Sequence, residues 1–398
     1  MSPFQEHRPE AAPAFEREPS TVARLRDLHT EPCVRAALKL HQYLMTAHWN
    51  GYGVVGPDSG VRFNRRIGRF IKSYLRFLPW RDSYYYLQAQ GYWSLANWSL
   101  FQHTGDAGYR EIALRCSEQM LDEQRKDGAW VYPNPEWKDR VATAECTWAS
   151  LGLLATYRYT ADERFLSSVL RWHHYLLNEV GFERSGDELA VNYFAKTRMA
   201  RVPNNSAFVL RFLAELADVT GEKAYMRECA GMLAFMRRAQ KPNGEFPYMV
   251  EGSIAGGRCW EHFQCYQYNA FQCLDLMRYY KITGNSAVRP VLEDCLGFLR
   301  TGIAEDGHMF YDCRNRSRQV IYHAAVTGAA FAIAGRLGFY GYETLCDRVF
   351  SYLLLRQRPD GSFPYSQGDY YFLHDARSYP RNLSMILFHL VSENACTP

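Results

Sequence analysis

The chain has 398 residues, of which 47% are apolar, and a formal net charge of +4. This length holds one large domain or two ordinary ones, and the apolar fraction can supply a sizeable core. The charge is too small to imply a nucleic-acid partner. Aromatic residues make up 15% and include 28 tyrosines, a composition that suits cores and also sugar or isoprenoid pockets.

The eleven cysteines are scattered and form no Cys-x-x-Cys pair, so the sequence predicts neither a zinc ribbon nor a disulfide framework. We expect most of them to be small buried hydrophobes in a reducing compartment. The sequence shows no N-terminal h-region and no apolar run of about 18 residues, which argues against secretion and against a membrane span. A cytoplasmic location is therefore expected, with no metal or other cofactor.

The N-terminal part of the chain is the least regular. Residues 1–30 carry Pro, Glu and Arg with little periodicity, which predicts a mobile arm. Apolar residues at helical spacing predict a first helix over 34–49, and the glycine-rich stretch 51–60 predicts a loop. Residues 62–80 combine an apolar face with a basic one. Such a helix either packs on the core or touches an anionic membrane surface or a lipid carrier, and both alternatives stay open.

A turn phrase then recurs along the chain. Gln-x-x-Asp/Asn-Gly-x-aromatic-x-Tyr occurs at 124–132, 240–248 and 357–365, with looser copies around Gly186 and Gly307. The glycines of the five copies are 54 to 63 residues apart. A period of this size indicates a repeated supersecondary unit.

The helical patterns between these turns are of two kinds. Half-exposed helices are expected near 108–123, 163–177, 223–239, 287–301 and 342–356. More apolar helices are expected near 84–102, 143–157, 205–217, 262–281, 320–337 and 376–391. With the helix at 34–49 there are six of each kind, which indicates an outer ring around a buried inner ring. The sequence thus predicts an all-α, single-domain (α/α)6 toroid of about twelve helices over residues 31–398.

The turn phrase resembles the repeat turns of terpenoid cyclases, of protein prenyltransferase β-subunits and of α/α-toroid carbohydrate enzymes. Residues 110–280 also resemble the C-terminal catalytic domain of D-glucuronyl C5-epimerases. The likeness lies in the turn 124–130, in the helix start Pro-Asn-Asn-Ser-Ala-Phe-Val-Leu at 203–210, and in Tyr248 followed by Trp260-Glu261-His262-Phe263. The family has its catalytic tyrosine where this chain has His262, so the resemblance implies related chemistry with a different acid or base.

The isoprenoid resemblance lacks its chemical motifs. Neither the Asp-x-Asp-Asp nor the Asp-Asp-x-x-Asp motif of the cyclases occurs, and the Asp-x-Cys zinc motif of the prenyltransferases is absent. These absences weigh against an isoprenoid cyclase or transferase, which is kept only as an alternative.

Polar clusters at the starts of the inner helices point to a site, because in a toroid these starts surround the mouth of the central cavity. Proton transfer beside a uronate carboxylate needs an acid, a base, and groups that hold the carboxylate and its developing charge. The candidate acid/base residues are Tyr248, His262, Tyr266, Tyr322 and His323. The candidate substrate-binding residues are Asn204, Asn205, Arg258, Trp148, Trp260, Asp375, Arg377 and Arg381.

Three carboxylates are candidates for a different reaction. Glu145 and Glu261, with Asp375, could supply the pair of carboxyl groups that glycoside hydrolysis requires. Both glutamates also fall in first turns, where a carboxylate complements the helix dipole.

Other candidates have structural explanations too. The polar run 204–206 after Pro203 is typical of a helix N-cap. Asp375, Arg377 and Arg381 could form an ion-pair network before the last helix. Tyrosines 248, 311 and 365 occupy equivalent turn positions, which indicates repeat packing at most of them.

The sequence therefore predicts an enzyme that transfers a proton at C5 of a uronic-acid-containing glycan, as an epimerase or a lyase. The alternatives are an isoprenoid cyclase or transferase, a glycoside hydrolase and a non-catalytic glycan-binding toroid. The expected partner is an anionic glycan or a lipid-linked substrate. A lipid-linked substrate would be bound at the inner membrane face, which residues 62–80 would contact.

Overall fold

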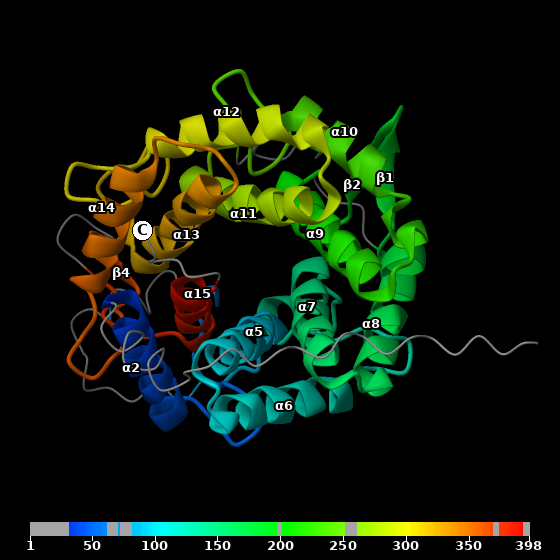
Figure 1. Cartoon of the computed structure of the whole chain (residues 1–398), viewed down its shortest axis with the longest axis horizontal. Coiled ribbons are helices and arrows are strands. Elements are labelled where there is room, and N and C mark those ends of the chain that lie inside the picture. Colours follow the sequence, from blue (N-terminus) through cyan, green and yellow to red (C-terminus); the bar gives the residue numbers. More distant parts are fainter. Residues whose placement is uncertain are drawn as a thin grey trace, which may run out of the picture.

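The computed structural model describes residues 32–61, 71, 82–196, 201–250, 261–368 and 374–392. Within them twelve α-helices form two concentric rings, seen end-on in Figure 1. The inner ring consists of α5 (Leu87–Thr104), α7 (Thr143–Thr160), α9 (Pro203–Thr220), α11 (Cys265–Thr283), α13 (Ile321–Arg336) and α15 (Pro380–Val391). The outer ring consists of α2 (Pro32–Ala47), α6 (Ala107–Asp122), α8 (Glu163–Tyr175), α10 (Cys229–Ala239), α12 (Arg289–Arg300) and α14 (Glu343–Leu354). The predicted all-α toroid is confirmed.

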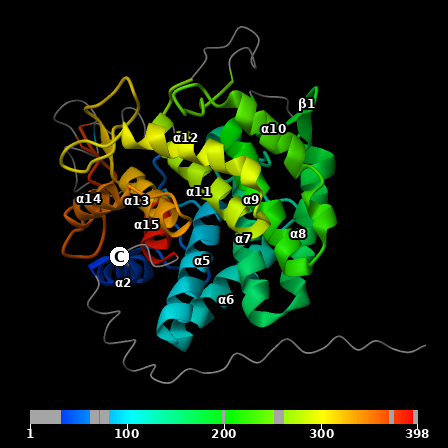
Figure 2. The same ribbon diagram turned by 45° about the horizontal axis from the view of Figure 1, so that its top comes forward.

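Strands play a small part in the described chain. β1 (Phe182–Ser185) and β2 (Glu188–Val191) form an antiparallel hairpin beside α10 (Figure 2), and β3 (Gln319–Val320) pairs with β4 (Ser366–Gln367). The predicted arm at 1–30 and the basic segment 62–80, apart from Ile71, lie outside the described residues.

The two rings differ in burial as their sequences predict. The inner helix α7 buries twelve of its eighteen residues, on all sides. The outer helix α8 buries five of thirteen, spaced three or four apart, so that one stripe faces the inner ring. A helix that is apolar all round is stable only between other elements, which places α7 and its equivalents inside.

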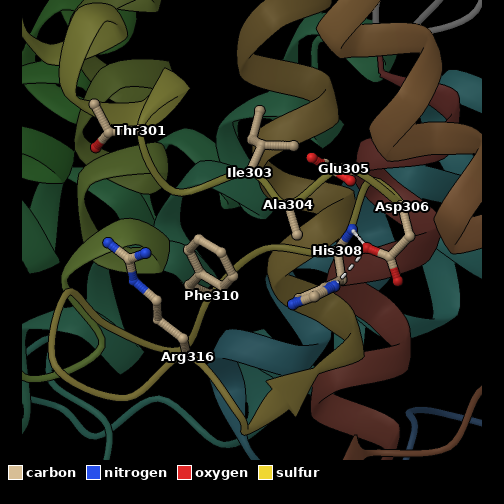
Figure 3. A pocket seen from close by; sticks show the side chains of 8 residues that line it. All are labelled: Thr301, Ile303, Ala304, Glu305, Asp306, His308, Phe310 and Arg316. Atoms are coloured by element: carbon tan, nitrogen blue, oxygen red, sulfur yellow. Dashed lines mark hydrogen bonds and ion pairs between the residues drawn. The ribbon is translucent and has the colours of Figure 1, made fainter.

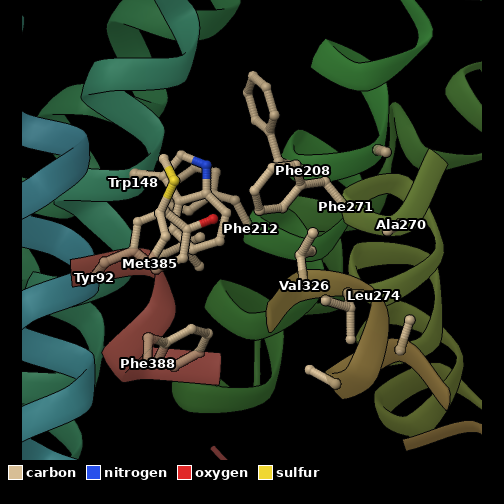
Figure 4. Packing of buried hydrophobic residues seen from close by; sticks show 14 of the residues in the cluster. Tyr92, Trp148, Phe208, Phe212, Ala270, Phe271, Leu274, Val326, Met385 and Phe388 are labelled. Carbon is tan, nitrogen blue, oxygen red and sulfur yellow. The ribbon is translucent and has the colours of Figure 1, made fainter. Parts of the chain in front are cut away.

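Aromatic side chains fill the middle of the inner ring, although the ribbons alone leave an opening there. Tyr92 and Trp148 stack with ring centroids 4.1 Å apart, and Phe208, Phe212 and Phe388 pack around them (Figure 4). All of these side chains are buried. Within the described chain these side chains close the middle of the toroid, so we look for a ligand site toward its ends.

The repeated turn follows an outer helix and forms a hydrogen bond to the neighbouring outer helix. The Gln124 side-chain amide donates to the carbonyls of Gly128 (2.9 Å) in its own turn and Ser168 (3.0 Å) in α8. Gln240 donates in the same way to Gly244 and Val291, and Gln357 to Gly361 and Ala36. The last pair links the turn after α14 to α2, so the phrase also closes the ring between the two ends of the fold.

Replacing Gln357 with leucine is expected to lower the free energy of unfolding by about 1–3 kcal/mol, because the carbonyls of Ala36 and Gly361 then lose a donor inside the protein. Gln119→Leu is the control, since Gln119 bonds only an exposed glutamate, and should change stability by less than about 0.5 kcal/mol. Urea denaturation followed by circular dichroism measures both. Equal effects would show that the turn does not close the ring.

The cysteines are mostly core residues, as predicted. Seven of the eight free cysteines in the described chain are buried, and Cys313 is partly exposed. Cys33 at the start of α2 is disulfide-bonded, which was not expected. None of the described helices is both long enough and apolar enough to cross a membrane.

Candidate active site

Tyrosines gather at the N-terminal end of the inner helices. Four of them, 132, 248, 311 and 365, stand four residues after a turn glycine, one in each of four repeats. Neighbouring rings contact one another, as in the pairs Tyr248–Tyr268 (4.8 Å) and Tyr365–Tyr379 (5.2 Å). We call the following set the tyrosine cluster: Tyr86, Tyr132, Tyr193, Tyr248, Tyr268, Tyr311, Tyr322, Tyr365 and Tyr379.

Five members of the tyrosine cluster keep partial solvent exposure: 132, 193, 248, 268 and 322. Burial of their surroundings still raises the pKa of Tyr248, Tyr268 and Tyr322 above that of free tyrosine. Their hydroxyls are therefore protonated at neutral pH and can donate hydrogen bonds to a ligand. The exposed part of the cluster is an aromatic surface edged with neutral donors.

Arg381, in the first turn of α15, is the cation of this surface. Its Nε lies 2.7 Å from Asp58 Oδ2, and its Nη2 donates to Asp58 Oδ1 at 2.8 Å. The guanidinium also lies 4.4 Å from the centre of the Tyr86 ring. Burial raises the pKa of four tyrosines, and the positive charge of Arg381 opposes part of this rise, so all four are neighbours of Arg381. They are Tyr132, Tyr193, Tyr268 and Tyr322.

Asp58 is a site residue that the sequence did not reveal. It lies in the glycine-rich loop 51–60, is fully buried, and also accepts a bond from the Gly60 amide at 2.7 Å. The loop thereby fixes the carboxylate that orients Arg381. The sequence left open an ion-pair network of Asp375, Arg377 and Arg381, but Arg381 pairs with Asp58 instead.

Glu145 holds a buried carboxyl group close to Arg381. Its Oε2 accepts from the backbone amide of Gln88 (2.9 Å), in the first turn of α5, a helix whose own N-cap residue Tyr86 makes no side-chain cap. Glu145 thus caps the neighbouring helix, whereas the sequence suggested a role in its own first turn. Burial raises the pKa of Glu145 to about 7, although Arg381 acts to lower it. A carboxyl group with this pKa can both accept and donate a proton near neutral pH.

The Glu145→Gln variant should reveal this titration. A raised pKa means that the folded state favours the neutral acid, so this stabilisation is present below pH about 4.5 and is lost as the pH rises through about 7. Between pH 5 and pH 8 the stability of the variant relative to wild type should rise by about 2–3 kcal/mol. Urea unfolding at both pH values measures the change. The same comparison with Glu111→Gln, at an exposed site, should show no such shift.

His323 lies behind the tyrosine cluster and is fully buried. Its ring is 6.0 Å from that of Tyr311 and 4.8 Å from that of Tyr322, and neither ring nitrogen has a partner among the described groups. Burial lowers its pKa well below 6.5, so the imidazole is neutral at physiological pH. Of the predicted acid/base residues, Tyr248, Tyr322 and His323 are therefore brought together.

His262 and Glu261 belong to a separate ionic group that precedes α11. His262 Nδ1 lies 2.8 Å from Glu245 Oε1, and Lys241 pairs with both Glu245 and Glu261. The hydrogen bond from Lys241 lowers the pKa of Glu261. This group shares none of these contacts with Glu145, so the structure does not pair Glu261 with Glu145.

Three further candidates lie outside the exposed surface of the cluster. Tyr266 stacks on Phe298 of α12 (4.9 Å) and so turns toward the outer ring. Trp148 belongs to the packed centre of the toroid. Asp375 is buried and accepts from the Tyr379 hydroxyl at 2.6 Å.

The asparagine pair is not the predicted cap. Helix α9 has Val202 at its N-cap with no side-chain cap bond, and Pro203 opens the helix. Asn204 is partly exposed, whereas Asn205 is buried and its Nδ2 has no partner among the described groups. Arg258 and Trp260 lie outside the described residues, and Arg377, ahead of α15, is partly exposed.

A hollow of about 600 Å³ lies along the segment 301–316 (Figure 3). Its most distinctive contacts are the Arg316 guanidinium 5.1 Å from the Phe310 ring and the His308–Asp306 pair at 2.5 Å. Its lining residues are Thr301, Ile303, Ala304, Glu305, Asp306, His308, Phe310 and Arg316. The hollow therefore involves a different part of the chain from the exposed tyrosines.

The fold is that of an α/α-toroid protein. Neither a family model nor a curated protein matches the sequence. Among solved structures, the cellobiose 2-epimerase from Bacillus thermoamylovorans matches with a TM-score of 0.69 and 13% identity, over 90% of this chain and 98% of that one. A polysaccharide lyase matches with a TM-score of 0.62 and 10% identity, over 90% and 96%. A possible member of the GH105 family from Salmonella enterica matches with 0.63 and 15%, over 97% and 98%. The structural matches show a shared toroid fold. At sequence identities this low they do not show a shared activity.

Proposed function

We propose that the chain is a carbohydrate-active enzyme that transfers a proton at a sugar carbon next to a carbonyl or carboxyl group. The observation that carries the proposal is the juxtaposition of Arg381, held by Asp58, with the buried carboxyl group of Glu145 beside partly exposed tyrosines. The matched solved structures include epimerases and a polysaccharide lyase, which have the same architecture over nearly their whole length. The substrate we favour is a uronic-acid-containing glycan that reacts at C5.

The surface suits an anionic sugar ring. Tyrosine rings pack on the C–H face of a pyranose while their hydroxyls bond its hydroxyl groups. Asp58 engages Nε and Nη2 of Arg381. In the proposed complex the remaining nitrogen, Nη1, donates to a substrate oxygen. A cation at this oxygen stabilises the negative charge that develops when the neighbouring carbon loses its proton.

Two groups on opposite faces of the sugar, Glu145 and a tyrosine, divide the proton transfer at C5. Ionised Glu145 takes the C5 proton, and a hydroxyl of the Tyr248–Tyr268 pair gives a proton back from the opposite face, which inverts the carbon and completes an epimerisation. In the lyase variant the same hydroxyl protonates the leaving oxygen. Burial raises the pKa of both tyrosines, so their hydroxyls are protonated at neutral pH and a proton is available to donate.

Glycoside hydrolysis is the second candidate. It rests on a specific observation, since two buried carboxyl groups, Asp58 and Glu145, both interact with Arg381. Distinct environments for two carboxyl groups are a known basis for acid and nucleophile roles. This pair replaces the predicted combinations of Glu145 with Glu261 or Asp375.

An isoprenoid enzyme is less well supported. Its substrate needs a large apolar cavity, and the described aromatic residues at the centre of the ring are packed against one another (Figure 4). The exposed end of the inner ring carries hydroxyls and charges instead.

Incubation with uronate polymers and uronate oligosaccharides in deuterated water tests the proposal. Proton NMR should show deuterium at C5 without cleavage for an epimerase. A new double bond absorbing in the ultraviolet would indicate a lyase, and new reducing ends without deuterium would favour the hydrolase. Absence of all three with every uronate and neutral sugar tried would overturn the proposal.

A further inference from the structure

Three metal-ligating side chains converge beside the tyrosine cluster. Glu245 comes from the turn before α11, Cys265 is the first residue of α11, and Cys313 lies in the segment before β3. One carboxylate oxygen and the two sulfur atoms all lie within 4.8 Å of one another. Glu245 and Cys265 are buried, and Cys313 is partly exposed. The group was not foreseen in the sequence, where its members are scattered and no pair has metal-binding spacing.

This spacing is close to that of a metal site. Zinc binds thiolate sulfur at about 2.3 Å in a tetrahedral arrangement, which puts two ligand atoms roughly 3.8 Å apart. The group therefore needs closure by at most about 1 Å, which small side-chain rotations supply. Two thiolates and one carboxylate favour zinc over magnesium or calcium, because the latter prefer sets of oxygen ligands.

The surroundings of the three ligands suit a bound cation. The backbone amide of Cys313 donates to Cys265 Sγ at 3.3 Å, so this sulfur acts as an acceptor, which is the role of a thiolate. His262 Nδ1 bonds the Glu245 carboxylate at 2.8 Å and orients it. Lys241 Nζ lies 3.6 Å from Glu245 Oε2 and offsets the excess negative charge of two thiolates and a carboxylate around a dication.

A second thiol pair shows what a packing contact looks like. Cys273 and Cys295 also neighbour each other, with the thiol of Cys295 directed to the Asn269 carbonyl at 3.5 Å, in an apolar core. No third ligand of the required kind joins them among the described residues. Cys265 and Cys313 differ from this pair because Glu245, which has its own hydrogen-bond and ion-pair partners, lies beside them as a third ligand.

We propose that Glu245, Cys265 and Cys313 bind one zinc ion, with a water molecule as the fourth ligand. The ion would tie the turn 240–248 and the segment 309–315 to the start of α11. Tyr248 follows Glu245 by three residues, and Tyr311 precedes Cys313 by two, so the ion would hold two members of the tyrosine cluster in place. The proposal does not depend on the proposed function, because it concerns a separate set of side chains.

The full-length protein, purified without chelator, should contain about one zinc per chain by inductively coupled plasma mass spectrometry. Cys265→Ser and Cys313→Ser should each lower zinc content or affinity roughly tenfold or more. Cys346→Ser is the matched control, since Cys346 is a buried thiol on α14 bonded only to the Gly328 carbonyl, and should retain the metal. Cobalt added to the metal-free protein should give the thiolate-to-metal charge-transfer absorption of a tetrahedral sulfur site, and circular dichroism confirms that each variant is folded.

Two results would overturn the zinc site. The first is a protein that binds neither zinc nor cobalt while its free thiols titrate as reduced. The second is a Cys265–Cys313 disulfide found by peptide mapping in protein purified without reductant, which would make the pair redox-active and leave no thiolates for a metal.

Discussion

Arg381→Met is expected to lower the free energy of unfolding by about 3–5 kcal/mol, because it leaves the buried carboxylate of Asp58 without its cation. The same substitution should abolish proton transfer on the sugar, since the site then lacks its cation. Urea denaturation measures the first effect, and deuterium exchange in the active substrate measures the second.

The double variant Asp58→Asn/Arg381→Met separates the two roles. Neutral asparagine still accepts from the Gly60 amide, so most of the lost stability should return while activity stays absent. Arg115→Met, which removes an exposed ion pair with Glu111, is the control and should cost no more than about 0.5 kcal/mol. If Arg381→Met is as mild as this control, Asp58 is not held by Arg381 in solution.

Gly244→Ala is expected to be the most damaging change in the repeated turn, at roughly 4 kcal/mol. Gly244 has a φ of +86°, and a Cβ atom there would lie 2.0 Å from the carbonyl oxygen of Asp294 in α12. The turn would have to move away from α12 and break the bond that Gln240 makes to Val291. Thermal and urea denaturation measure the loss.

Gly186→Ala isolates the conformational part of this cost. Gly186 also has a positive φ, +61°, but a Cβ atom there meets nothing within 4 Å. Its substitution should cost only the strain of a left-handed alanine, about 1–2 kcal/mol. Equal losses at the two glycines would contradict the view that the turn glycine permits close approach of the next outer helix.

The ring architecture was predictable because two independent patterns agreed. The spacing of the turn glycines set the repeat, and the alternation of half-exposed with fully apolar helices assigned each helix to a ring. Boundaries differed by a few residues, as in α9, expected at 205–217 and found at Pro203–Thr220. The extra first turn includes Pro203, which is favourable at the start of a helix because its missing N–H would have no partner there.

The pairing of charges was not predictable from local sequence. Arg381 was expected to bind a carboxylate, but its partner Asp58 is 323 positions away in a loop that looked like a connection. The three ligands of the proposed zinc site likewise come from three segments that are separate in the sequence and meet only in the folded chain. Contacts of this range depend on the geometry of the whole toroid, which no local pattern encodes.

The repeated spacing of the tyrosines indicates more than the packing role that we predicted for most of them. Their recurrence four residues after the turn glycine was taken to indicate packing, and Tyr311 and Tyr365 are indeed buried against other rings. A cyclic repeat, however, directs equivalent side chains toward one common axis. Tyr132 and Tyr248 therefore reach the same exposed surface as Arg381, and repetition contributes to the candidate site itself.

Solvent deuterium exchange with Tyr268→Phe and Tyr266→Phe tests most directly whether this surface is the active site. The two tyrosines are two residues apart on α11, but Tyr268 contacts Tyr248 in the cluster, whereas Tyr266 stacks on α12. We predict that the wild type and Tyr266→Phe exchange C5 hydrogen of the active uronate at the same rate, and that Tyr268→Phe is slower by about 100-fold or more. Exchange that survives in Tyr268→Phe and is lost in Tyr266→Phe would contradict the assignment.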